Sequence, residues 1–183
     1  MHLLIIADKN PQLNIPEIIR TEAVDLVVTL GDLNYFALQG LEQVSIPKIG
    51  VYGNHCRRGY FENLGIKDLH RQTYEQGGLT FLGLEGCVRY KPNPEAVMYT
   101  EEEMQAQMRG LPKVDIVISH CPPYGIHDDP SDATHVGFRV FHHYLDWAGP
   151  RYWLHGHTYP AVEETLVQNT KVVYTHGYKL LTL

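Results

Sequence analysis

The stretch Leu26-Val27-Val28-Thr29-Leu30-Gly31-Asp32-Leu33 joins a short apolar run directly to a glycine and an aspartate. A continuous apolar run of this length is typical of a strand that is buried on both faces. The glycine permits a sharp turn, so the aspartate stands at the carboxyl end of the strand. This order of strand and polar residue predicts a parallel sheet whose strand ends carry functional side chains.

The same order recurs along the chain. Apolar runs lead into polar residues in four further places: Leu3–Ala7 into Asp8, Lys48–Tyr52 into Asn54 and His55, Val114–Ser119 into His120, and Tyr152–Leu154 into His155 and His157. A single Gly-Asp or Gly-Asn-His is more often an ordinary turn. Five such places in series, each behind a buried strand, are hard to explain as turns. Because the carboxyl ends of parallel strands share one edge, these residues are expected on one rim.

The remaining segments complete a mixed α/β pattern. Helices are expected from Asn14-Ile15-Pro16-Glu17 onwards, from the capping box Thr100–Glu103 to about Gly110, and over Phe138–Trp147. Leu79–Leu84 is expected to form a strand, and the tail Val162–Leu183 an antiparallel hairpin that turns near Asn169. The total is roughly ten strands and four helices.

Length and charge limit the possible functions. The 183 residues fit one domain better than two, and residues 1–183 are expected to form it. A net charge of −6 leaves no basic surplus for nucleic acid or an anionic membrane. A phosphorylated substrate remains possible, since a bound metal supplies positive charge locally. The apolar start meets Asp8 too early for a signal sequence or a membrane span, and the three cysteines form no CxxC pair. We therefore expect a cytoplasmic protein.

The residues at the strand ends form a mixed set of oxygen and nitrogen donors. They are two carboxylates, one amide and two imidazoles: Asp8, Asp32, Asn54, His120 and His157. Such a set favours Mn, Fe, Zn, Ni or Co over Ca or a zinc held by thiolates. A metal-free nucleotide binder is excluded, because neither GxxxxGK[ST] nor GxGxxG follows the first strand. The sequence thus predicts a divalent-metal site.

In order and spacing, these motifs resemble the calcineurin-like metallophosphoesterases. The family signature is D-x-H, G-D, G-N-H, H and G-H-x-H, and the matching residues are Asp8, Gly31-Asp32, Gly53-Asn54-His55, His120 and Gly156-His157. The resemblance spans residues 1 to 183. It implies a four-layer α/β/β/α sandwich with two metal ions bridged by one carboxylate.

The resemblance also implies a role for each residue. Asp32 would bridge the metals, Asp8 would belong to the first, and Asn54, His120 and His157 would hold the second. A metal-bound hydroxide would attack the phosphorus in line, and His55 would protonate the leaving oxygen as general acid. This implies an enzyme that hydrolyses a phosphoester, a diester rather than a monoester. The substrate would be a phosphorylated small molecule or a nucleotide.

Two departures weaken the first metal site. The family's D-x-H stands here as Asp8-Lys9-Asn10, and its G-H-x-H as Gly156-His157-Thr158-Tyr159. Asn10 is a tentative replacement ligand. Tyr159 would have to bind as a phenolate, and because the pKa of a tyrosine hydroxyl is normally near 10, only a strong metal field would remove its proton. One ion is therefore expected to bind firmly and a second weakly. A relative with similar losses acts mainly as a protein scaffold but lacks the histidine of G-N-H. Scaffolding of a protein partner is the alternative function, which the retained His55 disfavours.

Three further residues are tentative substrate contacts, each with a simpler reading. Lys9 could bind phosphate or be a solvated lysine. Arg57 could make a bidentate hydrogen bond to a phosphate or be a surface charge. His155 could line the site or bond only to backbone. The sequence does not specify the oligomeric state.

Overall fold

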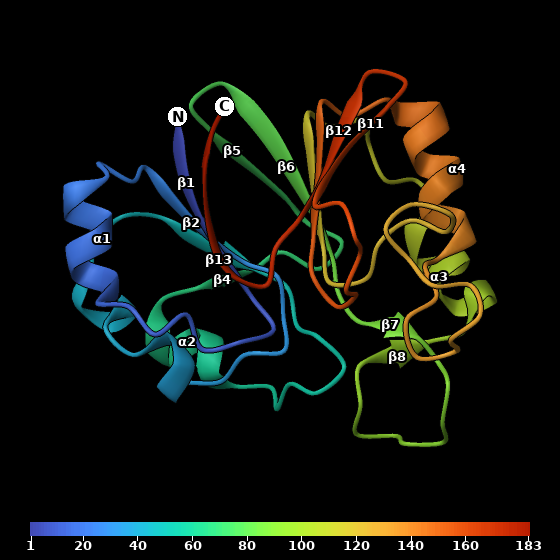
Figure 1. Ribbon diagram of the computed structural model, residues 1–183, viewed down its shortest axis with the longest axis horizontal. Coiled ribbons are helices and arrows are strands. Elements are labelled where there is room, and N and C mark those ends of the chain that lie inside the picture. The colour runs from blue at the N-terminus through green and yellow to red at the C-terminus, as the bar shows by residue number, and fades with distance from the viewer.

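The computed structural model describes residues 1–183 and contains two packed β-sheets with helices on both outer faces (Figure 1). The first sheet has the order β13 (Gly177–Thr182), β1 (His2–Ala7), β2 (Leu26–Thr29), β3 (Lys48–Gly50), β4 (Lys67–Asp68). The second has the order β11 (Glu164–Val167), β12 (Thr170–Tyr174), β10 (Tyr152–His155), β9 (Ile116–Ser119), β6 (Leu79–Leu84), β5 (Thr73–Gln76). A short parallel pair is formed by β7 (Cys87–Val88) and β8 (Met98–Tyr99).

Helices form the outer layers. Helices α1 (Ile15–Thr21) and α2 (Tyr60–Leu64) lie on the side of the first sheet, with two 3₁₀ turns, η1 (Phe36–Leu38) and η2 (Leu41–Gln43). Helices α3 (Glu101–Met108) and α4 (Arg139–Ala148) lie on the side of the second. The four-layer α/β/β/α sandwich expected from the sequence is confirmed. No helix is long and apolar enough to cross a membrane.

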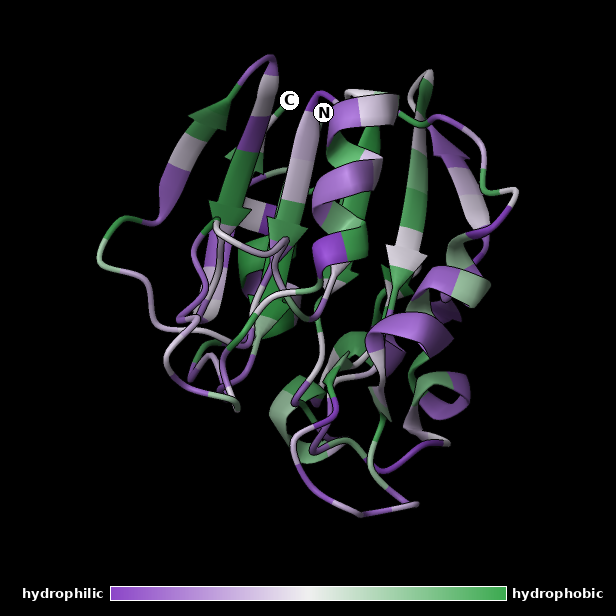
Figure 2. Ribbon diagram, turned by 90° about the vertical axis from the view of Figure 1, so that its right-hand side faces the viewer, coloured by the Kyte–Doolittle hydropathy of each residue, from purple (hydrophilic) through white to green (hydrophobic).

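Three buried clusters occupy the three interfaces between the layers. One includes Leu3, Val28 and Ile118 and lies between the sheets. The others pack each sheet against its own helices, around Phe61 on one side and Trp153 on the other. In Figure 2 green predominates on the inner strands, the outer strands carry purple and white stretches, and the helix nearest the viewer has purple on its outer face. Burial of apolar surface, the main stabilising term in folding, is therefore shared among three separate cores.

Local signals explain where the helices begin and end. The Asn14 side chain accepts a hydrogen bond from the Glu17 N–H and caps α1. Thr100 and Glu103 form a complete capping box at α3. Helix α4 ends at Gly149, whose left-handed conformation suits glycine. These helices start within about a residue of the expected positions.

Strand pairing brings the strand ends to one side. Strands β1, β2 and β3 are parallel neighbours, as are β6, β9, β10 and β12 in the second sheet. In Figure 1 the chain enters β1 from the top, so the carboxyl ends of the parallel strands point towards the bottom of the view. The loops after these strands meet there.

The structure corrects the expected tail and strand count. Strands β11 and β12 form the antiparallel hairpin near Asn169, but β13 leaves it and pairs antiparallel with β1 in the other sheet. The chain has thirteen strands rather than roughly ten. The extra strands include β4, β7 and β8, which have two residues each. They are too short to show the alternation of apolar and polar residues that marks a strand in a sequence.

Candidate metal centre

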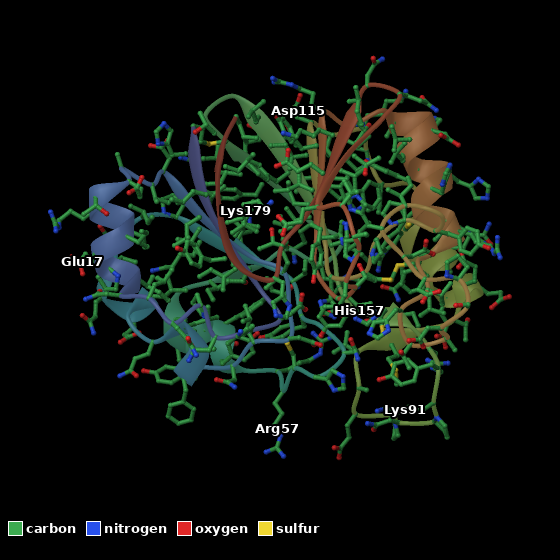
Figure 3. The ribbon with its side chains drawn as sticks, in the orientation of Figure 1. Glu17, Arg57, Lys91, Asp115, His157 and Lys179 are labelled. Carbon is green, nitrogen blue, oxygen red and sulfur yellow. The ribbon has the colours of Figure 1, made fainter.

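Three potential metal ligands meet where the two sheets face each other. The donor atoms of Asp32, His120 and His157 all lie within 4.8 Å of one another, and the two histidines are buried. They come from the loop after β2 in the first sheet and from the loops after β9 and β10 in the second sheet. Figure 3 shows His157 between the two halves of the molecule, near the carboxyl ends of the strands. The site therefore depends on the packing of both sheets.

His120 is held with one nitrogen towards the site. Its Nδ1 donates to the Leu30 carbonyl oxygen at 2.8 Å, which leaves Nε2 facing the other ligands. Nε2 lies 2.9 Å from Asn54 Oδ1 and 3.5 Å from Asp32 Oδ2. A backbone carbonyl that fixes the tautomer in this way is the usual outer partner of a metal-binding histidine.

His157 offers a nitrogen that the protein leaves unpaired. Its Nε2 is buried and has no hydrogen-bond partner. An unpaired buried polar atom costs about 1–3 kcal/mol. A divalent ion would supply the missing partner, so the residues present fit a metal.

Asn54 and His55 occupy neighbouring positions with different exposure. The Asn54 amide donates to Tyr90 Oη at 3.3 Å, which directs its oxygen towards His120. The His55 backbone N–H donates to Asp32 Oδ1 at 2.8 Å, while the His55 side chain is exposed and lines the cavity. The Asn54 oxygen is thus directed towards the cluster, and the His55 side chain is open to the cavity.

Asp8 is tied to the opposite loop. Its Oδ2 accepts a hydrogen bond from the His157 N–H at 2.9 Å, and its Oδ1 lies 3.9 Å from His120 Nδ1. Asp8, Asp32 and His157 all have positive φ, at 60°, 52° and 72°. Such backbone conformations are uncommon for residues other than glycine and concentrate at functional sites.

Two glycines allow the loops to approach this closely. A Cβ on Gly31 would lie 2.5 Å from the Gly53 nitrogen and 2.7 Å from His120 Nδ1. A Cβ on Gly53 would lie 2.7 Å from His120 Cε1. Glycine in the Gly-Asp and Gly-Asn-His motifs therefore makes room for the ligand beside it.

Burial and charge set different protonation states in the metal-free site. Burial raises the pKa of Asp8 to about 6. Burial opposes ionisation of Asp32, but the charge and hydrogen bond of His120 hold the Asp32 pKa well below its usual range. Burial and the charge of His120 lower the pKa of His157 to about 3, so this ligand is already neutral at pH 7. For His120, burial is outweighed by Asp32 and Asp8, which raise its pKa to about 9.

Metal binding at pH 7.5 is therefore expected to release about one proton, from His120. A ligand nitrogen must be deprotonated, and His120 keeps its proton below about pH 9 in the metal-free protein. The apparent affinity for Mn²⁺ should consequently rise about tenfold per pH unit between pH 6.5 and 8.5. Calorimetric titration in buffers of different ionisation enthalpy measures the released proton. An affinity independent of pH over this range would contradict the assignment.

The structure places the other sequence candidates outside the cluster. Asn10 is exposed, and its side-chain oxygen accepts from the Gln12 N–H. Lys9 is exposed, and Arg57 extends away from the molecule in Figure 3. None of the three lines the cavity that contains Asp32. His155 is buried, and its ring nitrogens contact His127 Nδ1 and the Gly156 carbonyl oxygen.

The cavity at the site has a volume of about 430 Å³ and a wall that the motifs do not describe. Its lining comprises Asp8, Asp32, Asn54, His55, Tyr90, Thr134, His135, His157 and Tyr159. Tyr90 belongs to a loop after β7, and Thr134 to the loop before α4. No spacing in the sequence marks these two residues. His135 stands in His135-Val136-Gly137, which resembles a stretch of one subgroup of the calcineurin-like metallophosphoesterases and predicts a position near the site without a specific role.

Comparisons with known proteins identify a matching family and related folds. A family model described as calcineurin-like phosphoesterase matches residues 9–161. One solved crystal structure has a TM-score of 0.71 at 16% identity and covers 98% of this chain and 94% of its own. The crystal structure of TT1561 of Thermus thermophilus has a TM-score of 0.68 at 14% identity and covers 96% and 88%. At these identities the two structures support the fold alone. No curated protein matches the sequence significantly.

Proposed function

The chain belongs to the calcineurin-like phosphoesterase family, and on that premise we propose that it hydrolyses a phosphodiester at a metal centre built on Asp32, Asn54, His120 and His157. Members of this family carry out metal-dependent phosphoester hydrolysis, and a candidate metal site is present. Two observations carry the proposal: His157 has a buried Nε2 without a hydrogen-bond partner, and a donor atom of this residue lies within 4.8 Å of donor atoms of Asp32 and His120.

Each residue of the chain has a distinct part in this proposal. Asp32, Asn54, His120 and His157 hold the ion, which when bound acidifies water and offsets negative charge on the phosphoryl group. The exposed His55 ring faces the cavity and donates a proton to the leaving oxygen. Its backbone N–H on Asp32 Oδ1 links the position of this ring to the ligand set.

We further propose that one ion binds firmly and a second only weakly. The first metal position would depend on Asp8, because Asn10 points to Gln12 and Tyr159 is 71% exposed. Asp8 already accepts the His157 N–H, which gives it a structural use without a second ion. Mn, Fe, Zn, Ni and Co all suit the oxygen and nitrogen donors of the complete site.

The proposed substrate is a phosphodiester, and it is either a phosphorylated small molecule or a nucleotide. A diester carries less negative charge than a monoester and needs less positive charge from the site. The cavity of about 430 Å³ falls within the usual range for small-molecule sites. The charge argument favours a diester over a monoester, and the cavity volume favours a compact substrate over a polymer.

The direct test is hydrolysis of bis(p-nitrophenyl) phosphate by the Mn²⁺-loaded protein, with p-nitrophenyl phosphate as the monoester comparison. We expect faster turnover of the diester, loss of turnover after chelation, and recovery when Mn²⁺ is returned. A protein that binds Mn²⁺ tightly yet hydrolyses neither ester would contradict the proposal and favour a scaffold that binds a protein partner.

A further inference from the structure

A loop outside the family motifs forms part of the cavity wall. This loop, residues 128–137, runs between β9 and α4. Asp128 joins the two ends of the loop, because its Oδ2 accepts from the Gly137 N–H at 2.9 Å, and its Oδ1 accepts from the N–H of Gly125, just before the loop, at 2.9 Å. The loop thus has a defined shape although it contains no helix or strand.

Asp132 organises the tip of this loop. Its Oδ1 accepts from the N–H and the hydroxyl of Thr134, at 2.9 and 2.7 Å. Its Oδ2 accepts from His135 Nδ1 at 2.6 Å. The hydrogen bonds from Thr134 lower the pKa of Asp132 to about 2, so the carboxylate is charged at neutral pH. His135 is therefore bound through Nδ1 to a fixed negative charge.

The other ring nitrogen of His135, Nε2, is available to a ligand in the cavity. The ring lines the same cavity as Asp8, Asp32 and His157, and Nε2 has no hydrogen-bond partner in the protein. The ring centroid lies 5.6 Å from that of His157 and 5.6 Å from that of Tyr159. Tyr159 occupies the position of the second histidine in G-H-x-H, which belongs to the weak first metal position.

A phosphoryl group bound at the complete site would lack positive charge on this side. From the Asp132–His135 geometry we propose that His135 supplies it, by donating from Nε2 to a non-bridging phosphoryl oxygen while Nδ1 donates to Asp132. His135 thus contacts the substrate of the proposed function, on which this inference rests, and Asp132 positions the ring. The ligand class is a phosphate or phosphoester.

The test measures binding of inorganic phosphate to the Mn²⁺-loaded protein by calorimetry, which requires no turnover. His135→Ala should weaken phosphate binding about 10- to 100-fold, because it removes a hydrogen bond to a charged group. Its Mn²⁺ affinity should not change. Asp132→Asn should weaken phosphate binding less, since asparagine can keep the Thr134 contacts but loses the charge. His135→Gln, which retains a donor, should recover part of the loss.

The matched control is His142→Ala. His142 also lies near an aspartate, Asp146 at 3.7 Å, but it is on α4 and does not line the cavity. This variant should bind phosphate like the wild type. Unchanged phosphate binding in His135→Ala would overturn the inference, and so would a parallel loss of Mn²⁺ affinity, which would place His135 at the metal instead. Phosphate binding that depends on His135 in a protein without hydrolysis would support the contact and count only against the proposed function.

Discussion

Asp32→Asn is expected to lower hydrolysis of a phosphodiester by at least about 10³-fold and to weaken Mn²⁺ binding strongly. The carboxylate lies at the centre of the site, with Oδ1 on the His55 N–H and Oδ2 at 3.5 Å from His120 Nε2. Removing the charge of Asp32 weakens a metal ligand and also removes the main charged partner of His120. Loss of one group that stabilises charge in a transition state lowers the rate about 10²–10³-fold.

Asparagine is the informative replacement because of the backbone. Asp32 has φ of 52°, where asparagine is tolerated and alanine is strained by about 1–2 kcal/mol. Asp32→Ala should abolish activity as well, but with an added loss of stability. Calorimetric Mn²⁺ titration and thermal unfolding separate the two effects. Asp25→Asn, in which the altered carboxylate meets only the His2 N–H, is the control. Full activity in Asp32→Asn would show that the hydrolysis comes from a contaminant.

The sequence predicted the fold well because each strand of the parallel core is an uninterrupted apolar run. Strands β1, β2 and β9 are buried at every position but the first of β1, so composition alone marks them. The capping residues Asn14 and Thr100 mark helix starts through contacts within three residues. Strand β13 could not be placed in this way, because its partner β1 lies at the other end of the chain.

The clustering of Asp32, His120 and His157 was predictable for a related reason, whereas the contacts that orient the side chains were not. In each sheet, topology brings the residues after neighbouring parallel strands to one edge, and the packing of the two sheets then brings the residue after β2 to those after β9 and β10. The orientation of His120 depends on the Leu30 carbonyl, 90 residues away, and that of Asn54 on Tyr90, 36 residues away. Such contacts arise from tertiary packing and leave no period in the sequence.

The first metal position shows the limit of motif reading. Asn10 follows Asp8 by two residues, as the missing histidine would, yet its side chain turns back to the Gln12 N–H. His135 matches no motif position, yet its ring lies at the cavity because Asp132 and the loop ends hold it there. Spacing alone therefore predicts the residues that cluster around Asp32 better than the residues expected at the first metal position.

His55→Ala is expected to reduce turnover selectively according to the leaving group. If the His55 ring protonates the leaving oxygen, an alkyl ester should lose about 10²–10⁴-fold and a p-nitrophenyl ester much less. A nitrophenolate is a weak base and can leave without being protonated, whereas an alkoxide is a strong base and has to be protonated as it leaves. Mn²⁺ affinity should be retained, because only the backbone N–H of His55 contacts Asp32.

The measurement compares kcat for bis(p-nitrophenyl) phosphate, which releases p-nitrophenolate, and for a dialkyl phosphodiester, whose only leaving group is an alcohol, in the wild type and in His55→Ala. His143→Ala, at an exposed position of α4, serves as the control histidine. Equal losses on both esters would assign His55 to the binding of the phosphoryl group rather than to proton transfer. A loss confined to the alkyl ester would make His55 the general acid and separate its role from that of the ligands around Asp32.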